Sequence, residues 1–557
     1  MSRIDNTCID REGVPRVMPG PGAASGGVGE GHPNPPPAML TPAELQEVFR
    51  HQLDAVCRVV EEQLRTLTLT VTAARMGQPA PQAALPAPVA SAKDREAPRP
   101  LTDGEAEIWM AAQFGAEANA AMTEVVTLRL EGPLDAERLL AAARAVLGRH
   151  GALRSRVSPG GESVRIDPDG AVPVRPSDLS REVDPEAALA AHLHAQAGHA
   201  FDPVAGPVAQ ADLVRLAEDR HVLILSAHHI ACDGWSFAVL AEEIAETYRS
   251  GPERLAPAPL RDAHRRSESE AAQALAYWAG LYADRPDPLD LPTDHPRPKL
   301  RGFTGDTRSA SLAPPLVAAL KDLAARQGQT LTATLLAAFQ VLLARLSGQD
   351  DLVVGVPMAG QPRCGAPGLV GHHADFLPLR ARIDPAEPFA THLARTGAAL
   401  AEAAGHADCT LGRLLRHLDR PHDPARPPLA QVQFNLQNFG NGLDFGGGLR
   451  GTLAPAPKRF STFELTVSLS ETADGITLDA TYNRALFEPA TIERWIGHYV
   501  TLLGHLARDP AQPIGRVPLL SPAERKSMLV DWNTTETAHP LKVGAMRAFQ
   551  LHARRAP

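Results

Sequence analysis

Residues 226–236 carry the side chains of this chain that are best suited to chemistry, and they read SAHHIACDGWS. Two adjacent histidines, His228 and His229, are followed by Asp233 and then by Gly-Trp-Ser. Imidazoles close to a carboxylate are compatible with three kinds of site: a metal centre, a packed histidine pair, or an acid/base centre. The element that carries the two histidines decides among them.

The segment HVLILSA at 221–227 is a short apolar run, which predicts a buried strand that ends at the two histidines. Because side chains alternate across a strand, His228 and His229 should point to opposite faces and should not share one metal ion. No helical i, i+4 histidine pair and no further ligand at metal spacing is present, so we expect no metal. One histidine is then packed and hydrogen-bonded, and the other faces a cleft as a general base or as a donor to an oxyanion.

The residues after the pair have supporting roles. Asp233 lies in a tight turn before Gly234, where a carboxylate can hold the loop through an arginine or orient a histidine. Ser236 can cap a helix with the sequence FAVLAEEIAETYRSG.

Composition excludes several classes of protein. The 557 residues have a net charge of −9, so neither nucleic acid nor an anionic membrane is an expected partner. The five cysteines lack a CxxC pair, which argues against a disulfide framework or a zinc ribbon and fits a reducing cytosol. The chain shows no signal peptide and no apolar run of about 18 residues, so we expect a cytoplasmic protein.

The N-terminal part of the chain differs in composition from the rest. Residues 1–39 are rich in Gly and Pro and are predicted to be disordered. Residues 40–68 have an apolar stripe at helical spacing, which predicts an amphipathic helix that either packs on the main domain or serves as a docking element. Residues 69–99 are an Ala/Pro-rich linker.

From residue 100 onward, helices and strands are expected to interleave in two blocks, 100–278 and 279–522, which indicates a mixed α/β fold. The patterns predict strands at 125–132, 221–227, 351–358 and 376–383, helices at 134–150, 237–251 and 331–348, and a hairpin at 464–483.

The histidine motif resembles the HHxxxDG signature of condensation domains from nonribosomal peptide synthetases, and it matches every fixed position. Other segments resemble motifs of that family in the same order: 101–113, 149–157, 277–298, 369–380 and 422–438. The chain departs from the family pattern at Gly104-Glu105, where Ala-Gln is usual, at Gly151, where Glu is usual, and at Asp375, where Asn is usual. Residues 523–557 resemble the connector and the first residues of an adenylation domain, so we expect a fragment of a larger synthetase.

The resemblance implies two lobes similar to chloramphenicol acetyltransferase, arranged in a V around a central tunnel. It also implies amide bond formation between a donor acyl thioester and the amine of an aminoacyl acceptor. An upstream acyl or peptidyl carrier protein supplies the donor in trans, and a downstream peptidyl carrier protein supplies the acceptor. Phosphopantetheine arms of these partners deliver the substrates. The chain itself is expected to bind no cofactor and to adjoin an adenylation domain.

The resemblance also implies roles for the motif residues. His229 acts as the base or as a positioning and charge-stabilising group, and these two roles stay open. His228 holds the loop, and Asp233 is structural and pairs with Arg297. The amide of Gly234 faces the reacting carbonyl, and Trp235 packs in the core or lines the tunnel.

Residues outside the motif are expected to support the tunnel. Asp375 is interpreted as a structural replacement, and Arg426 as one half of an ion pair that bridges the lobes. His372 and His373 form a second adjacent pair, interpreted as tunnel or surface residues and not as catalytic ones.

Two other functions are compatible with the sequence. One is a starter-type N-acyltransferase that uses acyl-coenzyme A as donor. The other is a non-catalytic recruitment scaffold of the same fold, although such domains usually lose the histidine motif, which is intact here.

Overall fold

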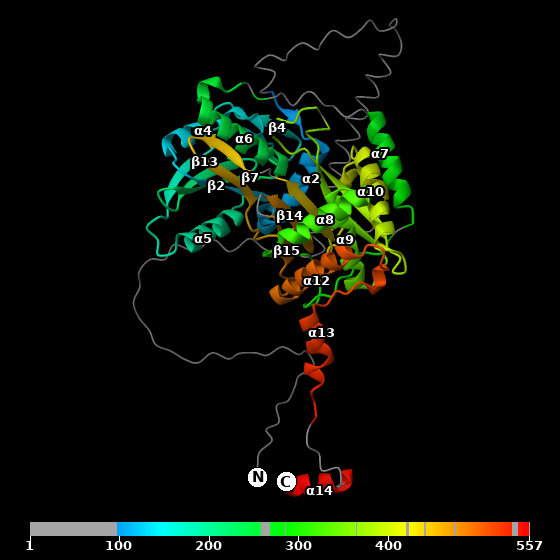
Figure 1. Ribbon diagram of the computed structural model, residues 1–557. Coiled ribbons are helices and arrows are strands. Elements are labelled where there is room, and N and C mark those ends of the chain that lie inside the picture. The colour runs from blue at the N-terminus through cyan, green and yellow to red at the C-terminus, as the bar shows by residue number, and fades with distance from the viewer. Residues whose placement is uncertain are drawn as a thin grey trace, which may run out of the picture. The chain divides into compact units, whose positions relative to one another are not determined.

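The computed structural model describes residues 97–555, except 257, 259–267, 285, 364, 419–422, 439–441, 473–474 and 537–543. The predicted tail (1–39), the predicted helix (40–68) and most of the predicted linker (69–99) lie outside the described residues. The described part has two six-stranded mixed sheets with helices packed on them, which confirms the mixed α/β fold (Figure 1).

The first sheet carries the histidine motif at the end of one of its strands. Its strands, in spatial order, are β12 (Leu443–Gly446), β13 (Leu449–Pro455), β2 (Thr123–Glu131), β7 (Arg220–His228), β6 (Ala209–Arg215) and β5 (Val174–Asp178). The strand β7 is apolar and buried along nearly all of its length, as the run HVLILSA predicts. It pairs with β2 in antiparallel register, so that Thr123 lies opposite His228.

The second sheet is formed entirely by residues after 300. Its strands, in spatial order, are β10 (Ala374–Arg382), β9 (Asp351–Ala359), β11 (Val432–Asn438), β14 (Leu465–Thr472), β15 (Gly475–Asn483) and β8 (Gly305–Leu312). The strands β14 and β15 pair antiparallel over their whole length, which confirms the predicted hairpin. A small third sheet contains β1 (Arg99–Pro100), β4 (Ser163–Ile166) and β3 (Ser155–Val157).

The helices cover the sheets with their apolar faces, because an amphipathic helix must bury its apolar stripe against another element. Figure 1 shows α4 and α6 beside β2 and β7, whereas α8, α9 and α12 gather near β14 and β15. The helix bounds are α2 (Asp103–Ala112), α3 (Ala116–Ala120), α4 (Ala136–Arg149), α5 (Pro185–Ala197), α6 (Gly234–Ser250), α7 (Glu268–Leu281), α8 (Pro314–Arg326), α9 (Leu331–Ser347), α10 (Phe389–Gly405), α11 (Leu411–Leu418), α12 (Pro489–Arg508), α13 (Pro522–Leu529) and α14 (Ala545–Arg555).

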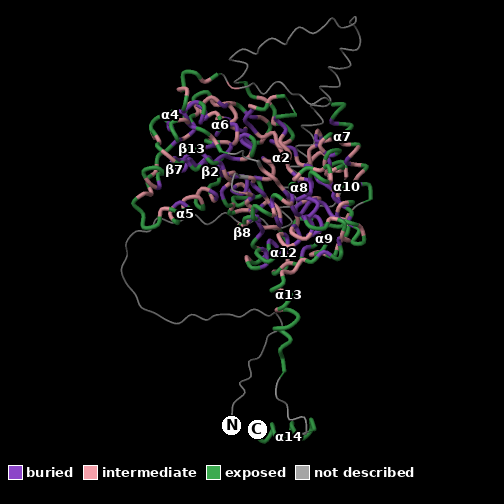
Figure 2. The backbone as a smooth tube through the Cα atoms, viewed as in Figure 1, coloured by how far each residue is buried: buried purple, intermediate pink, exposed green. Residues whose placement is uncertain are grey.

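Each of the two large sheets has its own apolar core, so the chain forms two lobes. The core of the second lobe centres on α9, in which every residue from Ala333 to Leu343 is buried (Figure 2). The two C-terminal helices α13 and α14 contain no buried residue.

The sequence pattern predicted that the lobes divide between residues 278 and 279, but the structure does not divide there. Trp278 at the end of α7 packs in the core of the second lobe, although it lies before that division. In the other direction, β12 and β13 return from the second half of the chain to the first sheet, where β13 pairs with β2. The pairing satisfies the backbone groups along the free side of β2, which would otherwise form an open sheet edge.

None of the described helices alone has both the length and the apolar character needed to cross a bilayer, whereas the bent pair of α8 and α9 meets those two criteria jointly.

Candidate active site

His228 is the packed member of the first histidine pair. It ends β7, and its side chain is completely buried. Its Nδ1 accepts a hydrogen bond from the Ile230 N–H at 3.2 Å, so the proton of the neutral ring is on Nε2, 3.0 Å from Asn119 Oδ1. Burial, with a smaller contribution from the charge of His229, lowers the pKa of His228 to about 3. The ring is therefore neutral and holds the end of the strand in place.

His229 directly follows the strand and is only partly buried. Its backbone N–H donates to the Met122 carbonyl at 2.7 Å, and its Nδ1 lies 3.0 Å from the Cys232 carbonyl oxygen. Because a carbonyl oxygen can only accept, Nδ1 carries a proton, and Nε2 of the neutral ring carries the lone pair. This tautomer can accept a proton at Nε2, as a general base must.

Asp233 is the N-cap of α6, which begins at Gly234. Its backbone is extended, and its Oδ1 accepts from the Ser236 N–H at 2.9 Å. The prediction that Ser236 caps the helix is therefore wrong, because Ser236 is already its third residue. The carboxylate takes this role because it reaches the N–H three residues on, as an N-cap side chain must. Gly234 at the start of the helix is exposed.

The predicted ion pair between Asp233 and Arg297 is also wrong. Arg297 instead contacts Glu464, with 2.6 Å between the guanidinium and the carboxylate. Gln361 Nε2 donates to both oxygens of Asp233 at 3.0 and 2.9 Å, and the His373 N–H donates to Oδ2 at 2.9 Å. Asp233 is 1% exposed, and these neutral donors satisfy its oxygens without an arginine.

Ser236 adds a second connection between the same segments. Its Oγ lies 2.7 Å from Asp233 Oδ1 and 3.0 Å from the Gly371 carbonyl, and it accepts from the Gly371 N–H at 3.1 Å. Gln361, Gly371 and His373 belong to the part of the chain that builds the second sheet. We call the set Asp233, Ser236, Gln361, Gly371 and His373 the inter-lobe clasp.

Trp235 is exposed and not packed in the core as predicted. Its side chain is 38% exposed, and its Nε1 donates to the Pro367 carbonyl at 2.7 Å. Residues two positions apart lie about 200° apart around an α-helix, so Trp235 lies on the side of α6 opposite to Phe237, which is 2% exposed.

Two further groups surround His229, and the sequence alone did not single them out for this role. The ring of His372 lies edge to face against the His229 ring, with 4.8 Å between the centroids and 83° between the planes. Glu124 on β2 forms an ion pair with Lys458 at 2.6 Å. Burial raises the pKa of Glu124, but Lys458 and His229 together outweigh it, so the pKa is lowered and the carboxylate is charged.

Gln437 on β11 brings an amide to the N-terminus of α6. A Cβ placed on Gly234 would lie 3.4 Å from Gln437 Nε2, and Gln437 Oε1 is buried with no partner among the described residues. The only sequence signal for Gln437 is its place in the motif at 422–438, and no local pattern pairs it with the histidines.

Asp375 and Arg426 each form an ion pair with a charged side chain. Asp375 is 6% exposed and pairs with Arg363 at 3.2 Å, so a cation balances the carboxylate that stands in the usual Asn position. Arg426 pairs with Asp290 at 2.7 Å and donates to the Leu289 carbonyl at 2.9 Å. Both partners are in the block 279–522, so the prediction that Arg426 bridges the lobes is wrong. Its partner Asp290 lies between α7 and β8, in the same half of the chain.

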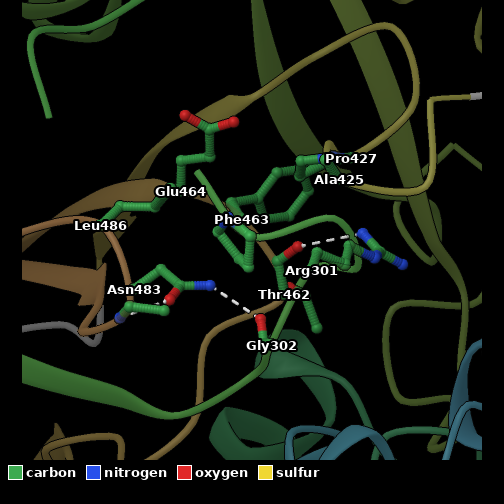
Figure 3. Close-up of a pocket in the computed structure, with 11 residues that line it drawn as sticks. Arg301, Gly302, Ala425, Pro427, Thr462, Phe463, Glu464, Asn483 and Leu486 are labelled. Carbon is green, nitrogen blue, oxygen red and sulfur yellow. Dashed lines mark hydrogen bonds between the residues drawn. The ribbon is translucent and has the colours of Figure 1, made fainter. Parts of the chain in front are cut away.

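A small pocket lies beside the pair of Arg297 and Glu464 (Figure 3). Its wall includes Arg301, whose guanidinium lies 5.0 Å from the centre of the Phe303 ring, and Asn483, whose Nδ2 donates to the Gly302 carbonyl at 2.7 Å. Burial lowers the pKa of Arg301. Within the described ranges, no group of three or more His, Cys, Asp or Glu residues is arranged to hold a metal ion.

Comparison with known proteins identifies one family. The sequence model described as "Condensation domain" matches residues 99–529. Chondramide synthase cmdD of Chondromyces crocatus is 35% identical over 82% of this chain and 12% of its own length. A polypeptide of the linear gramicidin synthase of Brevibacillus parabrevis is 33% identical over 90% of this chain and 10% of its own length. The chain thus spans about a tenth of the length of these relatives.

A solved structure supports the fold. The first condensation domain of the calcium-dependent antibiotic synthetase, in complex with substrate analogue 3a, superimposes with a TM-score of 0.68 at 26% identity. The match covers 77% of this chain and 100% of that chain.

Proposed function

The chain belongs to the condensation domain family, and from this premise we propose that it joins a donor acyl thioester to the amine of an aminoacyl acceptor thioester through an amide bond. Both substrates arrive on phosphopantetheine arms of carrier proteins. The donor comes from an upstream acyl or peptidyl carrier in trans, and the acceptor comes from a downstream peptidyl carrier. The single observation that carries the proposal is the His229 ring, fixed through Nδ1 with its lone pair on Nε2.

In the proposed reaction, the acceptor amine attacks the donor carbonyl carbon and forms the C–N bond. An α-amino group has a pKa of about 8, so a useful fraction is already neutral near pH 7. The nitrogen then loses a proton to His229 Nε2, and the C–S bond breaks as the oxyanion collapses. The donor arm leaves as a thiolate and takes the proton from His229, so the ring returns to its starting state. The product stays on the acceptor carrier.

The N-terminus of α6 supports the charge that develops on the carbonyl oxygen. The partial positive charge at a helix N-terminus favours an anion there, and the Gly234 N–H has no partner among the described residues. Gln437 Nε2 is a second donor close to Gly234. Two donors at a fixed place are the arrangement that stabilises a tetrahedral intermediate.

The ion pair of Glu124 and Lys458 is a further charged group in the surroundings of His229. The Glu124 carboxylate is charged and interacts electrostatically with His229, so it can balance positive charge at the site while a proton is in transit. This chain's own residues therefore supply the base, the charge support and the oxyanion donors, and the arms of the partners supply the reactive thioesters.

The proposed partners include an adjoining adenylation domain. Trp532 and Phe549 in the C-terminal segment are each 70% exposed, as expected for a segment that contacts another domain. We place the reaction in the cytoplasm. Two buried cysteines, Cys232 and Cys409, are free thiols in the structure, which fits a reducing compartment.

The test is a reconstituted condensation reaction followed by mass spectrometry of the acceptor carrier. Each donor from a panel of acyl groups is offered in two forms, on a carrier protein and on coenzyme A, together with an aminoacyl carrier. The proposal predicts an amide product from the carrier-bound donor with the wild type and none with His229→Ala. His194→Ala, on an exposed position of α5, is the matched control and should match the wild type.

Each other outcome points to a different function. Product from the coenzyme A form alone would identify a starter-type acyltransferase. No product from any donor, with carriers still bound, would identify a recruitment scaffold.

A further inference from the structure

The second histidine pair contributes one ring to the surroundings of His229. His372 comes from the segment before β10, and its ring lies edge to face against the ring of His229, 4.8 Å away. Edge-to-face contacts between aromatic rings at this separation are favourable and fix the angle between the rings. The contact therefore restricts how the His229 ring can tilt.

The backbone on both sides of His372 is held by the side chains of the first motif. The Gly371 N–H donates to Ser236 Oγ at 3.1 Å, and the His373 N–H donates to Asp233 Oδ2 at 2.9 Å. Both acceptors are buried, at 0% and 1% exposure, so these bonds are shielded from water. The inter-lobe clasp thus holds the backbone on both sides of His372.

A glycine on a third element leaves the room that the His372 ring occupies. A Cβ on Gly104 in α2 would lie 3.2 Å from His372 Cδ2 and 3.3 Å from Nε2. A side chain at residue 104 would therefore push the ring by a few tenths of an ångström toward His229 or away from it. Gly104 is the second residue of α2, and the absence of a side chain there leaves the space that the His372 ring occupies.

The contacts of the ring itself argue against a role in stability alone. His372 Nδ1 is buried with no hydrogen-bond partner among the described residues, and an apolar side chain would avoid that cost. Burial, followed by the charge of His229, lowers the pKa of His372 well below its ordinary value, against a hydrogen bond to the His229 backbone that raises it. His372 is therefore neutral and does not repel a proton that arrives on His229.

We propose that His372 is a positioning residue for His229, held by the inter-lobe clasp so that its ring keeps the His229 ring in the orientation that acts on the acceptor amine. The inference rests on the proposed function, because it concerns the rate of that reaction. It assigns His372 no contact with substrate. It also gives Asp233 a role beyond capping α6, and Ser236 a role beyond its place in the first turn of that helix.

The first experiment measures steady-state kinetics of condensation for His372→Ala and His372→Phe with carrier-bound donor and acceptor. His372→Ala should lower kcat by about tenfold, because a small displacement of a catalytic group has an effect of this order or larger. KM for both carriers should not change, since the ring contacts His229 and not the carriers. His372→Phe keeps an aromatic ring in the same space, so it should recover most of the lost kcat. A wild-type kcat for His372→Ala, or no recovery with Phe, would overturn the proposal.

The second experiment uses Gly104→Ala, which touches neither His229 nor the clasp. The substitution should change the melting temperature little, because the gain in helix propensity opposes the displacement of the ring, and yet lower kcat. In the His372→Ala background the ring is gone, so Gly104→Ala should then have no further effect on kcat. Equal losses in both backgrounds would show that Gly104 acts by another route and would overturn the proposal.

The two proposals fail in different ways. If the wild type forms product, His229→Ala does not, and the His372 variants behave as wild type, only the positioning role is overturned. If the wild type forms no amide product from any donor, the proposed function fails and the positioning role fails with it.

Discussion

The chain contains two adjacent histidine pairs, His228–His229 and His372–His373, and the same dipeptide is used in two different ways. In the first pair, Ile230 and Cys232 on the following turn and Asn119 in α3 fix the rings. The second pair precedes a strand, and Asp233 and Ser236 of the first motif hold its backbone. The surroundings of a histidine therefore set its role, and the residue types alone do not.

The strongest way to break the connection between the two pairs is Asp233→Ala. The variant loses an N-cap, worth about 1 kcal/mol, and leaves the donors of Gln361 and His373 buried without an acceptor, at about 1–3 kcal/mol each. We expect the free energy of unfolding to fall by about 3 kcal/mol or more, measured by denaturant titration. Asp233→Asn keeps one acceptor oxygen and should lose less. If Asp233→Ala lowers the free energy of unfolding by no more than the loss of an exposed N-cap does, about 1 kcal/mol, the inter-lobe clasp does not stabilise the protein.

A second prediction concerns the pH dependence of stability, which should reveal that His228, unlike the partly buried His229, is sealed in the fold. The pKa of His228 is about 3 in the fold, below the ordinary value of about 6.5, so the unfolded chain binds the extra proton between these values. The stability that neutral His228 contributes is complete above pH 6.5 and is lost as the pH falls toward 3. Between pH 7 and pH 5, the free energy of unfolding of the wild type should therefore fall by about 2 kcal/mol more than that of His228→Gln.

The comparison needs two denaturant titrations for each protein, one at each pH. Other histidines with lowered pKa values, among them His392, cancel in the difference between wild type and variant. A difference that stays constant with pH would show that His228 titrates normally and is not sealed in the fold.

The smallest of these effects is expected for Ser236→Ala, which removes one part of the clasp and keeps the Asp233 cap. The variant loses the Oγ contacts to Gly371 and leaves that backbone N–H unpaired, which costs about 1–2 kcal/mol. Ser250→Ala at the other end of α6 is the matched control and should change stability less. Equal effects of the two substitutions would mean that the Gly371 contacts contribute nothing to stability.

Local patterns in the sequence predict some of the strands and helices of both lobes, and others, such as β6, β13, α10 and α12, were not predicted. The apolar run at 221–227 and the long apolar helix at 331–348 are unambiguous, since length and periodicity determine the type of element. The motif around His229 likewise predicts the candidate site. The start of α6 was misjudged because Gly234 and Trp235 are poor helix formers, and the first favourable cap after them is Ser236.

The partners across the lobes could not be predicted, because they depend on residues that are far apart in the chain. Gln361 contacts Asp233 from 128 positions away, and several arginines fit the same carboxylate equally well on sequence alone. The return of β13 to the first sheet has no local signal either, since a short strand does not specify which sheet edge it joins. The position of Gly104 against the His372 ring, where a Cβ would lie 3.2 Å from Cδ2, likewise has no signal in the sequence.

The measurement that tests the account most directly is the single-turnover rate of condensation for His229→Ala, with both carriers loaded and the melting temperature recorded alongside. If Nε2 of His229 moves the proton, the rate should fall by at least about a hundredfold while the melting temperature stays near that of the wild type. A folded His229→Ala variant that forms the amide bond at close to the wild-type rate would contradict it.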